Sequence, residues 1–580
     1  MPYATYDLPA TLDAEIADLE SLIGRHLRGD CAEDVLKGSR VPFGVYEQRR
    51  KGAFMVRVRC PAGLITPAQL ETVAALAAEY GSGSIHLTTR QEVQIHQVNL
   101  RDVIAVIRRL RHAGLATRGG GGNTVRNIVA SPESGLFDGE AFDVTPYAVA
   151  LTNRFLQEPD SWGLPRKYKI AFSCSEDDTG HAAFTDLGFI ARRAGGVRGF
   201  RVYVAGGLGA KSQVGHLLHA FVPVEDVYPI AKAIKRLFDK QGNRQDRHAA
   251  RLRYLWNQLG DGEFVARYEQ ELDGVRRSGA APLALPAGPE QAPPEDEKAR
   301  AFSALATSAD FRRWKERFVR EQRRRGRFAV LVPVEFGDLG HRQASALARV
   351  LAPLGHDVVR VAFGQNLLLR NLPAGRLEEI FRLSQEISDL SAKPLLFGAS
   401  VACAGADTCK LGLCLSKGAL RAAHARLVES ALDLDGLGDF KLHLSGCPNN
   451  CGQHSIAHLG FSGKASHRGG RSYPAYKISV RGGGSSPSAL AEEVGEISAR
   501  DLPEMVVTFL SHYLSRKDRY GSYSDYLEAE GKQAIRDYAV RLRDIPPFEE
   551  DPRYYTDWGA SGPFSLAERG AGECAAGPPR

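Results

Sequence analysis

Two kinds of hydrophobic pattern follow one another in the same order in two parts of this 580-residue chain. Alternating apolar and polar residues predict strands, and apolar residues three and four positions apart predict amphipathic helices. The first part predicts strand 54–60, helix 68–79, strand 84–89 and helix 100–112. The second part predicts strand 327–333, helix 342–351, strand 357–363 and helix 374–387. Each series indicates a compact α+β lobe, and a longer stretch of mixed strands and helices follows each one.

The repeat extends to the residues themselves. Residues 169–189 (KIAFSCSEDDTGHAAFTDLGF) align without a gap on residues 441–461 (KLHLSGCPNNCGQHSIAHLGF). The identical pairs are Lys169/Lys441, Ser173/Ser445, Gly180/Gly452, Leu187/Leu459, Gly188/Gly460 and Phe189/Phe461. The register continues downstream, where FRVYVAGGL matches YKISVRGGG, and upstream, where SIHLTTRQEVQIHQV matches the segment around Gln365. A repeat of this length indicates a duplicated domain rather than a solenoid.

The two copies differ in the residues that carry chemistry. The first copy places four cations in Gly- and Pro-punctuated loops: Arg90, Arg126, Lys167 and Lys169. The aligned positions of the second copy are Gly364, roughly Ala402, Asp439 and Lys441. Conversely, Cys447 and Cys451 align with Ser175 and Thr179. We infer that one copy kept an anion-binding surface while the other acquired a metal cluster; ordinary surface Arg and Lys residues are the alternative for any single cation.

Four cysteines of the second copy form two closely spaced pairs, Cys403-x5-Cys409 and Cys447-x3-Cys451. Four thiolates that converge from two loops can hold a cubane iron–sulfur cluster. Neither pair has the Cys-x2-Cys spacing that is usual in structural zinc sites. Four buried structural thiols are the alternative, although buried cysteines rarely gather in Gly-rich loops. The pattern therefore predicts an iron–sulfur cluster.

The composition excludes several classes of protein. A net charge of +7 over this length, without a base-reading motif, does not indicate nucleic-acid binding. No run of 18 or more apolar residues occurs, and the first residues lack the pattern of a signal peptide. The remaining cysteines have no obvious partners: Cys31, Cys60, Cys174, Cys414 and Cys574. We therefore expect a cytoplasmic protein without disulfides and without a membrane-spanning segment.

On these residues the chain resembles the siroheme-dependent nitrite/sulfite reductase family over residues 43–530. The signatures are TTRQ at 88–91, VRN at 125–127, LPRKYK at 164–169 and the two cysteine pairs. The resemblance implies a pseudo-twofold α+β fold with two ferredoxin-like half-domains and two larger sulfite-reductase-type domains. The expected boundaries are a helical cap at 1–42, half-domains at 43–115 and 299–390, a siroheme and substrate domain at 116–275, a linker at 276–298, a 4Fe-4S and siroheme domain at 391–530, and a tail at 531–580.

The resemblance also implies two coupled cofactors, siroheme and a 4Fe-4S cluster. The cluster ligands would be Cys403, Cys409, Cys447 and Cys451, and Cys451 would also be the axial ligand of the siroheme iron. The carboxylates of siroheme need many Arg, Lys and backbone N–H donors. The further contacts implied are Arg166, Asn449, Lys211, Gly206 and Gly207, with plain tight turns as the alternative for the glycines. The catalytic residues implied are Arg90, Arg126, Lys167 and Lys169, which would bind the oxyanion and supply protons.

The Lys-x-Lys pair at Lys167 and Lys169 is typical of assimilatory sulfite reductases in this family, so sulfite is the expected substrate and nitrite the alternative. A Gly-x-Gly-x-x-Gly motif after a strand is not found, so we expect electrons from ferredoxin or a flavoprotein subunit. The basic segment 312–327 is either a docking surface for an acidic donor or a solvated helix. More remote alternatives are a precorrin-3B synthase-like oxygenase and a redox protein without turnover.

Overall fold

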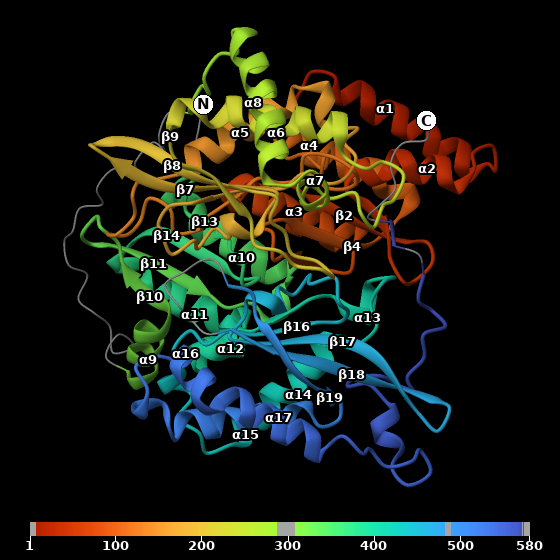
Figure 1. The fold of residues 1–580 in the computed structure, drawn as a ribbon, viewed down its shortest axis with the longest axis vertical. Coiled ribbons are helices and arrows are strands. Elements are labelled where there is room, and N and C mark those ends of the chain that lie inside the picture. The colour runs from red at the N-terminus through yellow and green to blue at the C-terminus, as the bar shows by residue number, and fades with distance from the viewer. Residues whose placement is uncertain (1–6, 287–307, 482–488, 571, 574–580) are drawn as a thin grey trace.

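A computed structural model describes residues 7–286, 308–481, 489–570 and 572–573 of the chain. The predicted linker at 276–298 lies partly outside these residues, and Cys574 lies wholly outside them. The sheets of the two larger domains lie toward opposite ends of the molecule, and the half-domain sheets lie between them (Figure 1). Within the described residues, no helix combines the length and the apolar content needed to cross a membrane.

The two half-domains have the same order of elements. The first contains β1 (Val45–Glu47), β2 (Ala53–Val58), α3 (Pro67–Tyr80), β3 (Ser84–Leu87), β4 (Val93–Asn99) and α4 (Val103–His112). The second contains β10 (Val319–Glu321), β11 (Arg327–Val332), β12 (Asp338–Gly340), α10 (His341–Leu351), β13 (Val359–Val361), β14 (Leu367–Pro373) and α11 (Leu377–Ile387). All the strands and helices predicted from the hydrophobic pattern are present, with ends shifted by a few residues. Strands β1, β4, β10, β12 and β14 were not predicted.

Strand β4 shows why the pattern missed it. Its pairing with β2 shifts register between Phe54 and Val56, and Gln97 within it has a φ of 62°. A bulge inserts one extra residue, so the alternation of buried and exposed side chains loses its period of two. Strand β14 has the corresponding bulge at Asn371, where φ is 60°.

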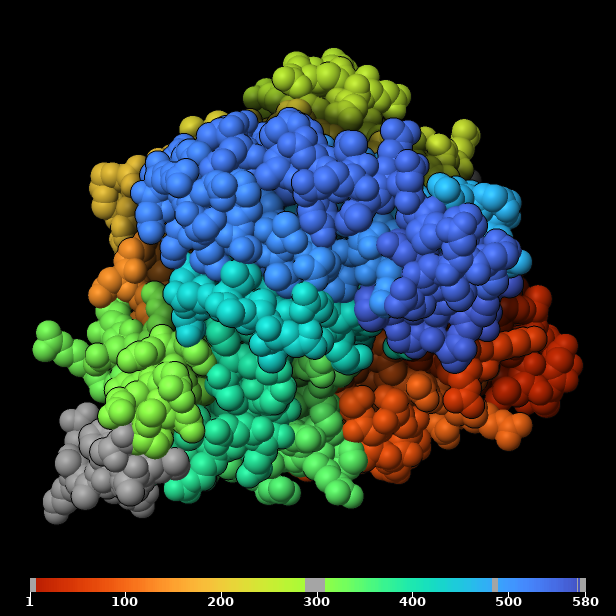
Figure 2. All heavy atoms as spheres, turned by 90° about the horizontal axis from the view of Figure 1, so that it is seen from below, coloured from red at the N-terminus to blue at the C-terminus, as the bar shows by residue number. Residues whose placement is uncertain are grey.

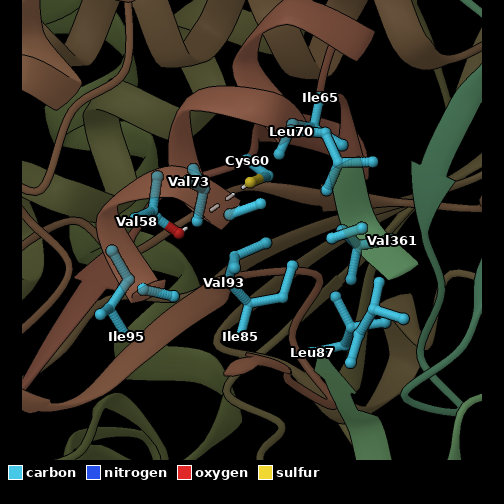
Figure 3. Close-up of a cluster of buried hydrophobic side chains, with 14 of the residues drawn as sticks. Val58, Cys60, Ile65, Leu70, Val73, Ile85, Leu87, Val93, Ile95 and Val361 are labelled. Carbon is cyan, nitrogen blue, oxygen red and sulfur yellow. Dashed lines mark hydrogen bonds between the residues drawn. The ribbon is translucent and has the colours of Figure 1, made fainter. Parts of the chain in front are cut away.

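The half-domains exchange strands across the pseudo-twofold axis. Strand β12 of the second copy pairs antiparallel with β3 of the first, with Asp338 opposite His86. In the reverse direction, Leu64 forms an isolated bridge with Arg360. One continuous hydrophobic core therefore serves both half-domains, and Val361 of β13 packs near Leu87 and Cys60 of the first copy (Figure 3).

The two larger domains share one sheet topology. The first sheet has β5 (Val129–Ala130), β6 (Ile170–Ser173), β7 (Leu187–Ala194), β8 (Val197–Val204) and β9 (His216–Pro223), adjacent in that order. The second has β15 (Val401–Ala402), β16 (Leu442–Ser445), β17 (Leu459–Arg468), β18 (Arg471–Val480) and β19 (Glu492–Ser498), also adjacent in chain order. In both sheets the first two pairings are parallel and the last two antiparallel. The predicted α+β duplication is confirmed.

Helices complete each larger domain. The first domain carries α5 (Thr145–Leu156), α6 (Val227–Gln241), α7 (Leu252–Leu259) and α8 (Asp261–Arg277). The second carries α12 (Leu395–Ala399), α13 (Gly405–Thr408), α14 (Ser416–Glu429), α15 (Leu502–Leu514), α16 (Tyr523–Tyr526) and α17 (Lys532–Arg541). Each of these domains has a core of its own, separate from that of the half-domains.

A segment near the C-terminus packs against residues nearer the N-terminus. Helices α1 (Leu12–Leu27) and α2 (Glu33–Arg40) pack on the half-domain core, as does α9 (Ala309–Phe318) ahead of β10. The buried carboxylate of Glu573 accepts two hydrogen bonds of 2.7 Å from the Arg40 guanidinium. Figure 2 shows the blue C-terminal segment beside the red N-terminal one. The C-terminal segment is thereby tied back to the half-domain edge.

Candidate active site

The four cysteines of the predicted cluster come from loops at one end of the second large sheet. Cys403 directly follows β15, Cys409 ends α13, and Cys447 and Cys451 lie in the loop after β16. Burial raises the pKa of the Cys451 thiol, and the next causes are the charges of Cys403, Cys447 and Cys409. The Cys447 pKa rises to about 12 for the same reasons, burial first. Such mutual effects mean that the four thiols lie near one another.

The surrounding backbone is shaped to hold these sulfurs. The Gly446 N–H donates to Cys403 Sγ over 3.2 Å. A Cβ at Gly446 would lie 2.5 Å from the Cys414 carbonyl oxygen, and one at Gly412 would lie 2.4 Å from the Gly405 carbonyl carbon. Only glycine permits such close approach of the two loops. N–H donors to sulfur and four thiols in one group are the features that an iron–sulfur cluster needs, so these residues fit it.

The first copy keeps the same backbone arrangement around hydroxyl groups. Ser131 directly follows β5, as Cys403 follows β15, and the Cys174 N–H donates to Ser131 Oγ over 3.2 Å. Ser131 Oγ in turn lies 2.7 Å from Oγ1 of Thr179, the residue aligned with Cys451. The cysteine site is therefore one of two equivalent loop pairs, and only its side chains make it a thiol site.

The predicted cations gather in front of the cysteine loops. Burial is the main reason that the pKa of Lys169 is well below its usual value, followed by the charges of Arg90 and Lys167. Burial likewise lowers the pKa of Arg90 to about 10, against the attraction of Glu92, with Arg126 as a further repulsive charge. The charge of Lys167 also acts on the thiol of Cys451, in the direction that favours the thiolate. The structure therefore brings all four predicted cations together.

The loop that carries Arg90 touches the loop that carries Cys451. Thr89 Oγ1 donates to the Cys451 carbonyl oxygen over 2.8 Å, and Gln453 Nε2 donates to the Thr89 carbonyl oxygen over 3.0 Å. Arg90 Nη2 donates to the Asn127 carbonyl oxygen over 2.8 Å, which holds its guanidinium beside the VRN segment. Cations of the first copy and cysteines of the second thus form one site.

Two arginines join this site that the sequence did not indicate. Arg251, just before α7, makes a bidentate ion pair with the buried Asp186, at 2.9 Å to each carboxylate oxygen. Arg251 is one of the charges that lower the pKa of Lys169, and burial followed by Arg251 lowers the pKa of Arg253. Neither arginine lies in a repeated motif, so only the packing of α7 could reveal them.

Of the other residues predicted to contact the siroheme, some are packed inside the protein and others are exposed. A Cβ at Gly207 would lie 2.8 Å from Arg251 Nη2, and one at Gly206 would lie 2.7 Å from the Ala183 carbonyl oxygen, so both glycines are required by close packing. Arg166 Nη1 lies 3.5 Å from Asn123 Oδ1. Lys211 and Asn449 are exposed. It is the neighbouring Asn450 that is buried, and its amide donates to Ser212 Oγ over 2.9 Å.

Several buried guanidinium nitrogens of the site have no protein acceptor. Within the described ranges, Arg126 Nε and Arg253 Nε and Nη1 lack a hydrogen-bond partner. An unpaired buried donor is costly, so native proteins usually provide an acceptor for it. A macrocycle with many carboxylates would provide such acceptors, and the donor set therefore fits siroheme.

Comparison with known proteins agrees with this site. The family model of the nitrite and sulphite reductase 4Fe-4S domain matches residues 121–275. The model of the nitrite/sulfite reductase ferredoxin-like half domain matches residues 46–113 and 320–387, one match in each copy. The four cysteines lie outside all three matches.

Among relatives, ferredoxin–nitrite reductase of Zea mays is 31% identical over 485 residues, which are 81% of this chain and 80% of that protein. Ferredoxin sulfite reductase 1 of Mycolicibacterium paratuberculosis is 24% identical over 527 residues, 86% of this chain and 90% of that one. The NirA protein of Mycobacterium tuberculosis shares the fold, with a TM-score of 0.73 at 22% identity over 90% of this chain and 97% of that one.

The chain belongs to the nitrite and sulfite reductase family. Siroheme and a 4Fe-4S cluster are the cofactors of this family, as the sequence predicted.

Proposed function

We propose that this enzyme reduces sulfite to sulfide with six electrons, at siroheme coupled to a 4Fe-4S cluster. Cys403, Cys409, Cys447 and Cys451 would hold the cluster, and Cys451 would also hold the siroheme iron. The observation that carries the proposal is the contact between the Thr89–Arg90 loop and the Cys451 loop. That contact joins the oxyanion-binding side chains to the thiols. When bound, the two cofactors supply the electrons one at a time and an iron position for the oxyanion.

The protein side chains bind the oxyanion and handle the protons. Conversion of hydrogen sulfite to hydrogen sulfide ion takes up six electrons and six protons and releases three waters. Arg90 and Arg126 stay protonated and suit fixed binding of the oxyanion oxygens. Lys169, whose pKa is held low by burial and by Arg90, can donate a proton from Nζ and regain it. Lys167, whose charge favours the thiolate of Cys451, supplies a second ammonium group.

Nitrite is the second candidate, and one observation favours it. The low pKa of Lys169 makes its neutral form accessible, and a site with one cation fewer suits a monoanion. The Zea mays relative is named a nitrite reductase and is more similar to this chain than the Mycolicibacterium sulfite reductase. Sulfite remains our first proposal because six cations converge here, and the carboxylates of Asp186 and Glu92 offset only part of their charge.

A protein donor of electrons, with ferredoxin as the first candidate, is part of the proposal. Both relatives carry ferredoxin in their names. The turn after β1 lies on the cluster loop, since the Arg49 N–H donates to the Thr408 carbonyl oxygen over 2.9 Å. Arg50 and Lys51 are exposed at that turn and offer an acidic donor a contact beside the cysteines. The basic residues 320–327 instead lie against loop 136–137 of the first copy, where the Arg323 N–H donates to the Leu136 carbonyl oxygen over 2.8 Å.

Anaerobic turnover tests the proposal directly. Purified holoenzyme receives electrons from a dithionite-reduced dye, and kcat/KM is measured for sulfite and for nitrite. We expect the higher value for sulfite; a higher value for nitrite would reassign the substrate, and no turnover of either would indicate a redox protein without catalysis. Arg126→Ala should lower kcat/KM by roughly 10²–10³ while the haem spectrum is retained, because one oxyanion donor is lost.

A further inference from the structure

A second cationic cavity lies away from the cysteines, between the first large domain and the second half-domain.

 This space of about 230 Å³ is smaller than the usual pocket for an organic ligand, so it suits an inorganic ion rather than a nucleotide. The polar side chains that line it are Asp143, Gln322, Arg324, Arg327, His356, Asp357, Arg370 and Asn371.

The two carboxylates of this cavity are already engaged. Asp357 Oδ1 accepts hydrogen bonds from Arg360 Nε at 3.1 Å and Nη2 at 2.6 Å, and Arg360 is fully buried. Asp143 Oδ1 accepts from Ser134 Oγ and from the Thr145 N–H, each at 2.9 Å. Asp357 Oδ2 also lies 3.4 Å from Arg370 Nε, so this carboxylate offsets part of the charge of Arg370 as well as that of Arg360. The guanidinium groups of Arg324 and Arg327 line the cavity too, and the three lining arginines outnumber its two carboxylates.

The internal repeat shows which group lacks a partner. Gln48 follows β1, and its amide lies 2.8 Å from His96 Nδ1 while its oxygen accepts from the Gln97 N–H at 2.8 Å. Gln322 follows β10 in the same way, but the position of His96 is taken by Arg370. Gln322 is 6% exposed, and its Nε2 has no hydrogen-bond partner within the described part of the chain.

We propose that this cavity binds a small tetrahedral oxyanion such as inorganic phosphate or sulfate. The amide N–H of Gln322 and the guanidinium groups of Arg324, Arg327 and Arg370 are its donors. A guanidinium group can donate two parallel hydrogen bonds to two oxygens of such an anion. The buried amide of Gln322 adds a further donor. Chloride has no separate oxygens to accept these bonds, so it should bind less well. The bound anion links loop 135–143 to the second half-domain, so it stabilises the folded holoenzyme.

Calorimetric titration of the holoenzyme with inorganic phosphate, and separately with sulfate, tests this proposal at constant ionic strength. We expect one saturable site for each anion, a rise in Tm, and no change in the haem absorption spectrum. Gln322→Glu keeps the side-chain shape but adds a negative charge, and it should weaken binding at least tenfold. Arg324→Gln, at an exposed position that tolerates change, should weaken binding about as much.

The matched control is Arg325→Gln, in the same turn but outside the cavity, which should leave binding unchanged. Three results would overturn the proposal: no saturable binding, equal binding in the parent and in both cavity variants, or binding that always shifts the haem spectrum. The second result would mean an adventitious ion only, and the third would place the anion at the active site.

Discussion

The two copies of the repeat share a backbone and differ in their chemistry. Residues with positive φ recur at aligned positions: Ala62 and Phe336, Gln91 and Gln365, Gln97 and Asn371, Asp178 and Asn450, and His181 and Gln453. The loop contacts recur as well, since an N–H donates over 3.2 Å to Ser131 Oγ in one copy and to Cys403 Sγ in the other. The cations and the thiols do not recur. The duplicated backbone therefore supplies two equivalent frames, and a few side chains decide what each one binds.

The largest effect should come from turning a thiol into the hydroxyl of the other copy. Cys451→Ser removes the proposed shared ligand, and a serine hydroxyl does not replace a thiolate as a ligand of iron. We expect loss of the cluster absorbance and of nearly all reductase activity, measured together with the iron content. The matched control is Thr179→Ser at the aligned position, which keeps the hydroxyl and should leave both unchanged. Full iron content in Cys451→Ser would exclude this cysteine as a cluster ligand.

The next effect separates two aligned lysines. Lys169→Met should lower kcat/KM by roughly 10²–10³, because a half-buried proton donor and its charge beside Arg90 are lost. Lys441→Met should change it less than threefold, since Lys441 is exposed and its charge acts on His443 and His458 rather than on the Arg90 group. Steady-state rates with the reduced dye provide the measurement. Equal losses in both variants would show that the cationic site is not confined to the first copy.

A smaller effect should follow from loosening the cysteine loop. In the first copy, Glu140 accepts from three N–H groups of its own loop, at 2.6, 3.1 and 2.8 Å. In the second copy, the C-terminal segment holds the cysteine loop instead. The Gly570 N–H donates to the Lys410 carbonyl oxygen of that loop over 3.0 Å, and Glu573 pairs with Arg40.

Glu573→Ala leaves part of the buried Arg40 charge unpaired, at a cost of roughly 3–5 kcal/mol. We expect the cluster absorbance to decay several-fold faster in the presence of an iron chelator. Glu568→Ala, an exposed position on the same segment, is the control and should decay like the parent. Equal decay in all three proteins would mean that this segment does not protect the cluster loop.

The smallest effect is a pH dependence at one pair of aligned residues, Asp178 and Asn450. Burial raises the pKa of Asp178 to about 6, against hydrogen bonds from Ser173 and from two backbone N–H groups. Between about pH 4 and pH 6 the folded chain keeps a proton that the unfolded chain has released. The contribution of this group to stability therefore falls as pH rises through that window and stays low above it.

Asp178→Asn removes this titration. From pH 5 to pH 7.5 the stability of the variant relative to the parent should rise by about 1 kcal/mol, which is measured as a change in the difference of their Tm values. Asp177→Asn, at the exposed neighbouring position, should show a difference that does not vary with pH. A constant difference for Asp178→Asn would indicate that Asp178 is ionised throughout.

Local patterns were sufficient for much of the fold and for part of the site. The strands and helices of the half-domains follow from periodicity because one face of each packs on a core. The bulged strands β4 and β14 were not predicted, because the extra residues at Gln97 and Asn371 break the alternation of buried and exposed side chains. The cysteine pairs and the cations were recognisable because each copy serves as a reference for the other. The exposed positions of Lys211 and Asn449 could not be read from their motifs.

The sequence by itself determined the duplication, the two cysteine pairs and the identities of four cations, since each is a matter of residue type and spacing. Only the tertiary structure decided that Arg251 and Asp186 belong to the site, that the Thr89 loop lies on the Cys451 loop, and that Glu573 reaches Arg40. These contacts join residues far apart in the chain, and they depend on how two copies pack face to face. No local sequence pattern predicts this packing, because it depends on the hydrophobic surface that both copies bury together.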